Sequence, residues 1–173
     1  MKTIIIYYSQ TESTKKVAET LALSLKADIC EVKDLKERDG LKNRFGSLVD
    51  AFRENKTEIY PPVLNLEEYG TVYFGTPTWA NNAAPAIITM IDRCDLFGKD
   101  VVLFATMSNS GGDSAIEKME KKVKARGARV IEQFTIKTKD KSLSQLEKDS
   151  AGHPPYRRRP YCHCGRQRSS AVP

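Results

Sequence analysis

The stretch Thr3-Ile4-Ile5-Ile6-Tyr7-Tyr8-Ser9-Gln10-Thr11-Glu12-Ser13-Thr14 decides which fold this sequence predicts. Residues 3–8 are all β-branched or aromatic, without polar alternation, which is typical of a strand buried on both faces of a parallel sheet. Polar residues follow, and apolar side chains then recur at helical spacing. These are Val17, Ala18, Leu21 and Leu25. A buried strand that passes through a short polar loop into a helix is the opening of a β-α-β arrangement.

The same alternation of strands and helices continues along the chain. Apolar runs predict buried strands at residues 71–75 and 101–105, and further strands are predicted at 130–136 and, more weakly and at an edge, at 27–32. Helices are predicted between them, over 41–52, 85–91 and 116–123, and a last one over 142–148. Five strands that alternate with helices predict an α/β fold. We expect a doubly wound parallel sheet in three layers, with its ligand at the carboxyl ends of the strands.

Length and charge divide the chain into one domain and a tail. The 173 residues, 40% hydrophobic and 29% charged, suit a single globular domain, which we place at residues 1–149. Residues 150–173 hold five arginines and no acidic residue, so most of the net charge of +6 belongs to this basic tail. We expect the tail to be a disordered or a non-native extension. The alternatives are a soft-metal site at residues 161–164 and nucleic-acid or lipid contacts by residues 157–159.

Composition excludes several chemistries for the body of the chain. Both histidines, His153 and His163, lie in the tail, so the body offers no Ser-His-Asp triad and no histidine-based metal site. We therefore expect no catalytic side chain and no metal. Cys30 and Cys94 are expected to be reduced core thiols. No apolar run approaches the roughly 20 residues that span a bilayer, and the expected location is the cytoplasm, without membrane or nucleic-acid partners.

The loop after the first strand is unusually rich in hydroxyl groups. It contains the candidate ligand-binding residues Ser9, Gln10, Thr11, Glu12, Ser13 and Thr14. Four hydroxyls in six residues, together with backbone N–H groups at a helix start, predict a cage for a phosphate. The alternative is an elaborate helix cap, which needs only one or two of these hydroxyls.

These residues resemble the opening motif of the flavodoxin family. The rest of the sequence resembles a compact, short-chain subgroup of that family. The matching positions are Tyr7, Ser9, Thr11, Thr14, Ala18 and Leu21. The sequence departs from the family at Glu12, where a small residue, most often Gly, is usual. An acid beside a phosphate is unfavourable, so we expect the Glu12 side chain to turn toward water, where its charge still favours the helix dipole. The resemblance implies the strand order 2-1-3-4-5.

Two further loops extend the resemblance over residues 2–140. The loop after the second buried strand looks like the family's segment around the ribityl chain and flavin ring. Its candidate residues are Pro77, Thr78, Trp79, Ala80, Asn81 and Asn82. The loop after the third buried strand is similar to the family's third flavin loop, with candidates Ser108, Asn109, Ser110, Gly111 and Gly112. The resemblance implies FMN as the cofactor. Trp79, which we expect on a loop, has a flat indole that can stack on the flavin ring, and the alternative is a partly buried packing residue. Met107 and small residues stand where many flavodoxins carry a tyrosine.

Three functions remain open for such a site. The one we favour is a flavodoxin-type electron carrier that shuttles electrons between a reductase and an acceptor protein. The first alternative is an FMN-dependent NAD(P)H oxidoreductase acting on quinones or similar acceptors. The second is a flavodoxin-like interaction module without FMN. Receiver domains are excluded, because Tyr8-Ser9 and Gly75-Thr76 stand where they need acidic residues at the strand ends. Low-molecular-weight tyrosine phosphatases are excluded, because the first loop has no cysteine for their Cys-x5-Arg cradle.

Overall fold

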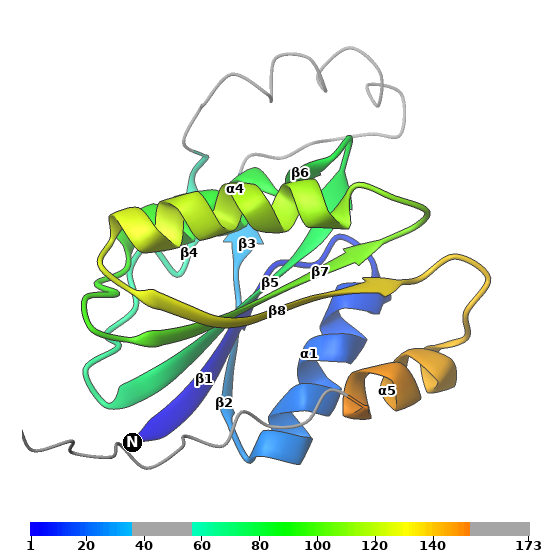
Figure 1. The fold of residues 1–173 in the computed structure, drawn as a ribbon, viewed down its shortest axis with the longest axis horizontal. Coiled ribbons are helices and arrows are strands. Elements are labelled where there is room, and N and C mark those ends of the chain that lie inside the picture. Colours follow the sequence, from blue (N-terminus) through cyan, green and yellow to red (C-terminus); the bar gives the residue numbers. More distant parts are fainter. Residues whose placement is uncertain (36–56, 153–173) are drawn as a thin grey trace, which may run out of the picture.

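The computed structural model describes residues 1–35 and 57–152 (Figure 1). Within these residues, five strands of the main sheet and four helices follow one another. They are β1 (Lys2–Tyr7), α1 (Glu12–Leu25), β2 (Asp28–Glu31), β5 (Tyr69–Trp79), α3 (Pro85–Arg93), β7 (Asp100–Met107), α4 (Gly112–Ala125), β8 (Arg129–Lys137) and α5 (Leu143–Ala151). The helix predicted at 41–52 lies outside the described residues.

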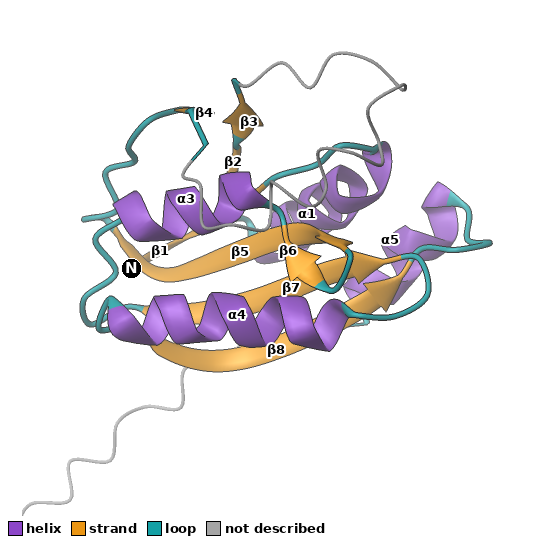
Figure 2. Cartoon of the chain, turned by 90° about the horizontal axis from the view of Figure 1, so that it is seen from above, coloured by secondary structure: helices purple, strands orange, loops and turns teal. Residues whose placement is uncertain are grey.

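The main sheet confirms the predicted topology. Its strands pair in parallel in the order β2-β1-β5-β7-β8, which is the expected order 2-1-3-4-5. Helices α1 and α5 cover one face, and α3 and α4 cover the other, so the molecule has three layers (Figure 2). The predicted edge strand is β2, and Pro85 is the first residue of α3, where its missing N–H costs no hydrogen bond.

The two faces of β1 explain its unbroken apolar sequence. Ile4 and Ile6 pack into the core cluster under α3 and α4. Ile5 and Tyr7 pack into the second cluster, with Val17, Ala18 and Leu21 of α1. Because successive side chains of a strand point to opposite faces, a strand between two helix layers has to be apolar at every position.

The sheet also contains features that the sequence did not predict. Strand β5 is longer than expected. After it the chain turns back, and β6 (Asn82–Ala83) pairs antiparallel with the end of β5. A short antiparallel ribbon joins β3 (Lys33–Asp34) to β4 (Ile59–Tyr60). Helix α5 ends at Ala151, three residues later than predicted. Strands of two residues are too short to show the periodicity on which sequence patterns depend.

The two described cysteines behave as unreactive packing residues. Cys94 is 1% exposed, and burial raises the pKa of its thiol to about 12. Cys30 is half-buried against the same core cluster, and burial also raises its pKa, helped by the nearby Glu31. Both thiols therefore stay protonated near neutral pH, as expected of core thiols.

The close packing of β5 against β7 depends on Gly75. It lies opposite Tyr7 and Phe104, and a Cβ added to it would stand 2.0 Å from Cζ of the Phe104 ring. We predict that Gly75→Ala lowers the free energy of unfolding by about 1–3 kcal/mol through overpacking. Urea unfolding followed by circular dichroism measures this. Adding Phe104→Leu makes room, so the double variant should lose less than the sum of the single variants, and simple additivity would contradict the prediction.

Candidate functional site

Three loops meet at the carboxyl edge of the sheet. They follow β1, β5 and β7, which are neighbours in the sheet, so the loops lie side by side at one edge (Figure 1). In doubly wound sheets this edge is where ligands bind. All the candidate residues predicted from the sequence lie on these loops or on the helix and strand ends that adjoin them.

In the first loop, one hydroxyl serves the start of helix α1. Ser9 Oγ accepts a hydrogen bond from the backbone N–H of Lys15 at 3.1 Å and donates one to the carbonyl of Thr11. Thr11 is the capping residue by its backbone angles, but its side chain makes no capping hydrogen bond. The amides of residues 12–14 have no partner inside the helix, because the first turn of any helix lacks the preceding carbonyls. Capping thus occupies one hydroxyl of the four that the sequence supplies.

Glu12 lies as expected, with its side chain directed to water. The side chain is 71% exposed, and its carboxylate is 3.5 Å from Lys15 Nζ. An exposed carboxylate one turn from a lysine exerts a screened, weakened field on the loop beside it. The departure from the family motif at this position is therefore compatible with an anion at the helix start.

Thr14 is buried in the first turn of α1. Its side chain is 1% exposed, and its Oγ1 lies 2.7 Å from Oγ1 of Thr106, which is 4% exposed near the end of β7. Sequence reasoning gave Thr14 a place in the first loop but gave Thr106 no role. The signal that could have found Thr106 is a lone hydroxyl directly after the buried apolar run of residues 101–105.

The second loop is a β-hairpin, and this corrects the placement of Trp79 on a loop. Trp79 is the last residue of β5 and pairs with Asn82 of β6. Ala80 and Asn81 connect the strands with φ angles of 44° and 63°. Two central residues with positive φ match the twist of the flanking strands, which favours so short a connection.

Trp79 is held against the first loop. Its ring meets that of Tyr8 edge to face, with centroids 5.6 Å apart and planes at 89°. Both rings are half-buried. Tyr8 was not among the predicted site residues, although it stands directly between β1 and the hydroxyl-rich loop. This contact fixes the indole in relation to the start of α1.

The rest of the hairpin contains one unsatisfied polar atom. Thr78 Oγ1 is buried and has no hydrogen-bond partner within the described part of the chain. By contrast, Thr76 Oγ1 accepts from the N–H of Ala84 at 2.9 Å, and Asn82 Oδ1 accepts from Lys118 Nζ of helix α4. A buried hydroxyl without a partner is costly, so Thr78 is a natural contact for a polar ligand.

The third loop packs directly on the second. Gly111 has a φ of 90°, and a Cβ added there would lie 2.1 Å from Asn81 Oδ1. A Cβ on the buried Gly112 would lie 2.7 Å from Thr135 Cγ2 and 2.9 Å from Met107 Sδ. These two glycines therefore let the backbone of the third loop approach its neighbours. The residues before them, Ser108, Asn109 and Ser110, are exposed.

Met107 packs against the start of helix α4. It is 9% exposed, with its sulfur beside Gly112 and Thr135. Its carbonyl accepts two hydrogen bonds from Thr138, from the N–H at 2.8 Å and from Oγ1 at 3.2 Å. The side chain is thus a packing element under helix α4 and does not take the place of the tyrosine that many flavodoxins carry.

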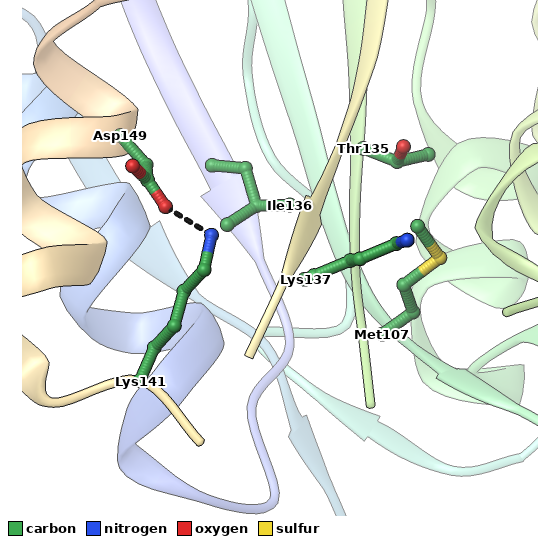
Figure 3. A pocket seen from close by; sticks show the side chains of 6 residues that line it. All are labelled: Met107, Thr135, Ile136, Lys137, Lys141 and Asp149. Carbon is green, nitrogen blue, oxygen red and sulfur yellow. Dashed lines mark hydrogen bonds and ion pairs between the residues drawn. The ribbon is translucent and has the colours of Figure 1, made fainter. Parts of the chain in front are cut away.

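A hollow of about 380 Å³ adjoins the third loop at the ends of β7 and β8 (Figure 3). Lys137 lies on the same side of β8 as Met107, whereas Lys141 and Asp149 form an ion pair on the other side (Figure 3). This hollow shares only Met107 with the three loops, and the charge of Lys141 is already neutralised. We therefore assign the candidate site to the loops.

The described residues offer no other evident chemistry. No group of three or more histidine, cysteine or acidic side chains stands close enough among them to hold a metal ion. None of the helices within residues 1–35 and 57–152 combines the length and apolarity needed to cross a membrane.

A doubly wound sheet with three converging loops at its carboxyl edge defines a ligand-binding protein of the α/β class. The sequence model of the family described as Flavodoxin matches residues 2–146, and this chain belongs to the flavodoxin family. A comparison with curated proteins finds no match.

Solved structures share the fold. A candidate flavoprotein from Bacteroides uniformis superposes with a TM-score of 0.72 at 24% identity, covering 85% of this chain and 96% of that one. A Lactobacillus acidophilus flavoprotein in complex with FMN gives a TM-score of 0.60 at 20% identity, over 78% and 92% of the two chains. Oxidised flavodoxin 2 from Bacillus cereus gives 0.57 at 18% identity, over 87% and 95%.

The packing of the third loop on the second can be tested at Gly111. We predict that Gly111→Ala lowers the free energy of unfolding by about 1–3 kcal/mol more than Gly98→Ala does. Gly98 is the matched control because it also has a positive φ, of 70°, but no atom lies within 4 Å of an added Cβ. Thermal and urea unfolding measure both variants. Asn81→Gly should recover part of the loss in Gly111→Ala. Equal losses at the two glycines would show that only backbone strain matters.

Proposed function

We propose that this protein binds FMN at the three loops and carries electrons between protein redox partners in the cytoplasm. Membership of the flavodoxin family supports FMN as the cofactor, and a neighbour in fold, from Lactobacillus acidophilus, has been crystallised with FMN. The observation that carries the proposal is the start of α1, where Ser9 serves the helix end, Thr14 is bonded to Thr106, and the hydroxyl residues Thr11 and Ser13 stand beside the first amides of the helix.

The first loop fits the phosphate of FMN. A doubly charged anion is favoured here by three features: the free amides of residues 12–14, the hydroxyls of Thr11 and Ser13, and the N-terminal end of the helix dipole. Ser9, Gln10 and Thr14 complete the loop. The donors to the phosphate are thus neutral groups. Lys15, at the edge of the loop, forms an ion pair with Glu12.

The second and third loops fit a flat, polar-edged ring. Trp79 supplies an aromatic surface, and the unpartnered hydroxyl of Thr78 supplies a hydrogen bond beside it. Gly111 and Gly112 allow the backbone to come close, and Asn81 and Asn109 add amide groups. Pro77, Ala80, Asn82, Ser108 and Ser110 shape these loops.

FMN supplies the redox chemistry when it is bound, since it accepts and releases electrons. The chain's own residues bind it, orient it and exclude water from one side. Burial raises the pKa of Tyr7, so this neighbour of the first loop stays protonated and gives no base. A carrier needs no side chain that moves a proton, which is consistent with a body that lacks histidine.

An absorbance experiment on the purified protein tests this function. We expect it to take up one equivalent of FMN, to bind riboflavin at least about tenfold more weakly, and to be reduced by NADPH only when a flavoprotein reductase is added. Failure to take up FMN would instead indicate an interaction module. Steady oxidation of NADH or NADPH by the protein alone would indicate an oxidoreductase acting on quinones or similar acceptors.

The unusual acid at the phosphate loop gives a second test. We predict that Glu12→Gln tightens FMN binding by about threefold at low salt, because it removes a negative charge beside the phosphate, and that the gain shrinks as ionic strength rises. Equilibrium dialysis against FMN measures it, and riboflavin should bind equally well to both proteins. Glu19→Gln, farther along the same helix, is the control. Weaker FMN binding by Glu12→Gln would contradict this arrangement.

A further inference from the structure

We propose that Thr106 is a positioning residue for the phosphate site: it donates its hydroxyl hydrogen to Thr14 and so leaves the hydrogen of Thr14 for the ligand. This inference rests on the proposed binding of FMN. It adds to the site a residue of β7 that touches the ligand only through another side chain.

The geometry brings together two residues that are 92 positions apart in the sequence. Their Oγ1 atoms lie 2.7 Å apart, and both side chains are almost completely buried. Thr14 is in the first turn of α1, the turn assigned to the phosphate. Thr106 belongs to a strand whose neighbours at this level are Pro77 of β5 and Ile136 of β8. Thr106 is therefore fixed by the sheet, and its β-branched side chain has few rotamers available.

Counting hydrogens gives this bond a direction. Each hydroxyl has one hydrogen to donate and can accept at its oxygen, so either threonine can be the donor when no ligand is present. A phosphate dianion only accepts. Once Thr14 donates to it, the remaining bond between the threonines can form only if Thr106 is the donor. Thr106 thereby keeps the buried oxygen of Thr14 satisfied while the Thr14 hydrogen points at the phosphate.

Alternative partners for Thr14 are limited by its surroundings. The charged groups of the same helix end, Glu12 and Lys15, face solvent and contact each other. Lys16 is paired with Glu147 of α5 at 2.6 Å. Thr106 is thus the polar side chain that the structure pairs with Thr14 in the interior. Loss of the Thr106 hydroxyl would leave the buried oxygen of Thr14 without a donor. The Thr14 hydroxyl would then no longer be held in the orientation that donates to the phosphate.

The test compares FMN with riboflavin, which lacks the phosphate. In Thr106→Val, an isosteric change that removes only the hydroxyl, we expect the Kd for FMN to rise by about fivefold and the Kd for riboflavin to change by less than about twofold. Thr106→Ser should restore binding of FMN. In a Thr14→Val background, Thr106→Val should have no further effect, because it acts through Thr14. Thr20→Val, on the same helix, is the control for losing a hydroxyl elsewhere in α1.

Each other result has a distinct meaning. Unchanged FMN affinity in Thr106→Val, equal weakening of FMN and riboflavin, or full additivity with Thr14→Val would each overturn the positioning role. If Thr106→Val does not fold, the same comparison of the Kd values for FMN and riboflavin is made between Thr106→Ala and Thr106→Ser. If the unmodified protein binds FMN no better than riboflavin, the phosphate site itself fails, and the proposed function fails with it. That result is distinguishable because it precedes any substitution.

Discussion

The arrangement of the site depends on the register of three neighbouring strands. Tyr7 pairs with Gly75, and Gly75 pairs with Phe104, so the end of β1 lies beside the later part of β5 and β7. From this level β5 continues to Trp79 and β7 to Met107. The ring of Phe104 occupies the space that a side chain at position 75 would need. Because parallel strands present their carboxyl ends to one edge, this register decides that the hydroxyl-rich loop, the hairpin and the glycine-rich loop meet. A shift of one residue would turn the side chains of a strand to the opposite layer, so the two helix layers hold the register in place.

Three contacts between loops convert this meeting into a prearranged site. Thr14 and Thr106 join the first loop to β7, Tyr8 and Trp79 join it to the hairpin, and Asn81 packs on Gly111 to join the hairpin to the third loop. Each contact spans a different pair of elements, so no loop is positioned only by its own sequence. Loops ordered before a ligand arrives spare it the entropy cost of ordering them, which is how preorganisation increases affinity. Thr138 adds to this by holding the carbonyl of Met107 at the point where the third loop leaves the sheet.

The sequence was sufficient for the features that depend on patterns several residues long. The apolar run at residues 3–8 and the run at 101–105 predicted buried strands, and the spacing of Val17, Ala18 and Leu21 predicted the face of α1 that packs on them. The outward position of Glu12 followed from elementary electrostatics. The hairpin after Trp79 was missed because a strand of two residues carries no periodic signal. The partnership of Thr14 with Thr106 and the inward turn of Met107 were missed because both depend on contacts between segments far apart in the chain, including the space left by Gly112.

The distribution of aromatic side chains around the loops is compatible with the electron carrier that we propose. Within the described loops, the aromatic rings are those of Tyr8 and Trp79, and both lie on the side of β1 and β5. The side of β7 offers Ser108, Asn109 and Ser110, which are exposed, because Met107 packs under α4. A site that catalyses a reaction on a second small substrate gains from enclosing it and excluding water on all sides. A carrier has the opposite requirement, since electrons have to leave through an accessible surface toward a partner protein. An aromatic wall on one side and an open polar loop on the other meet that requirement, and the half-buried Trp79 marks the boundary between them.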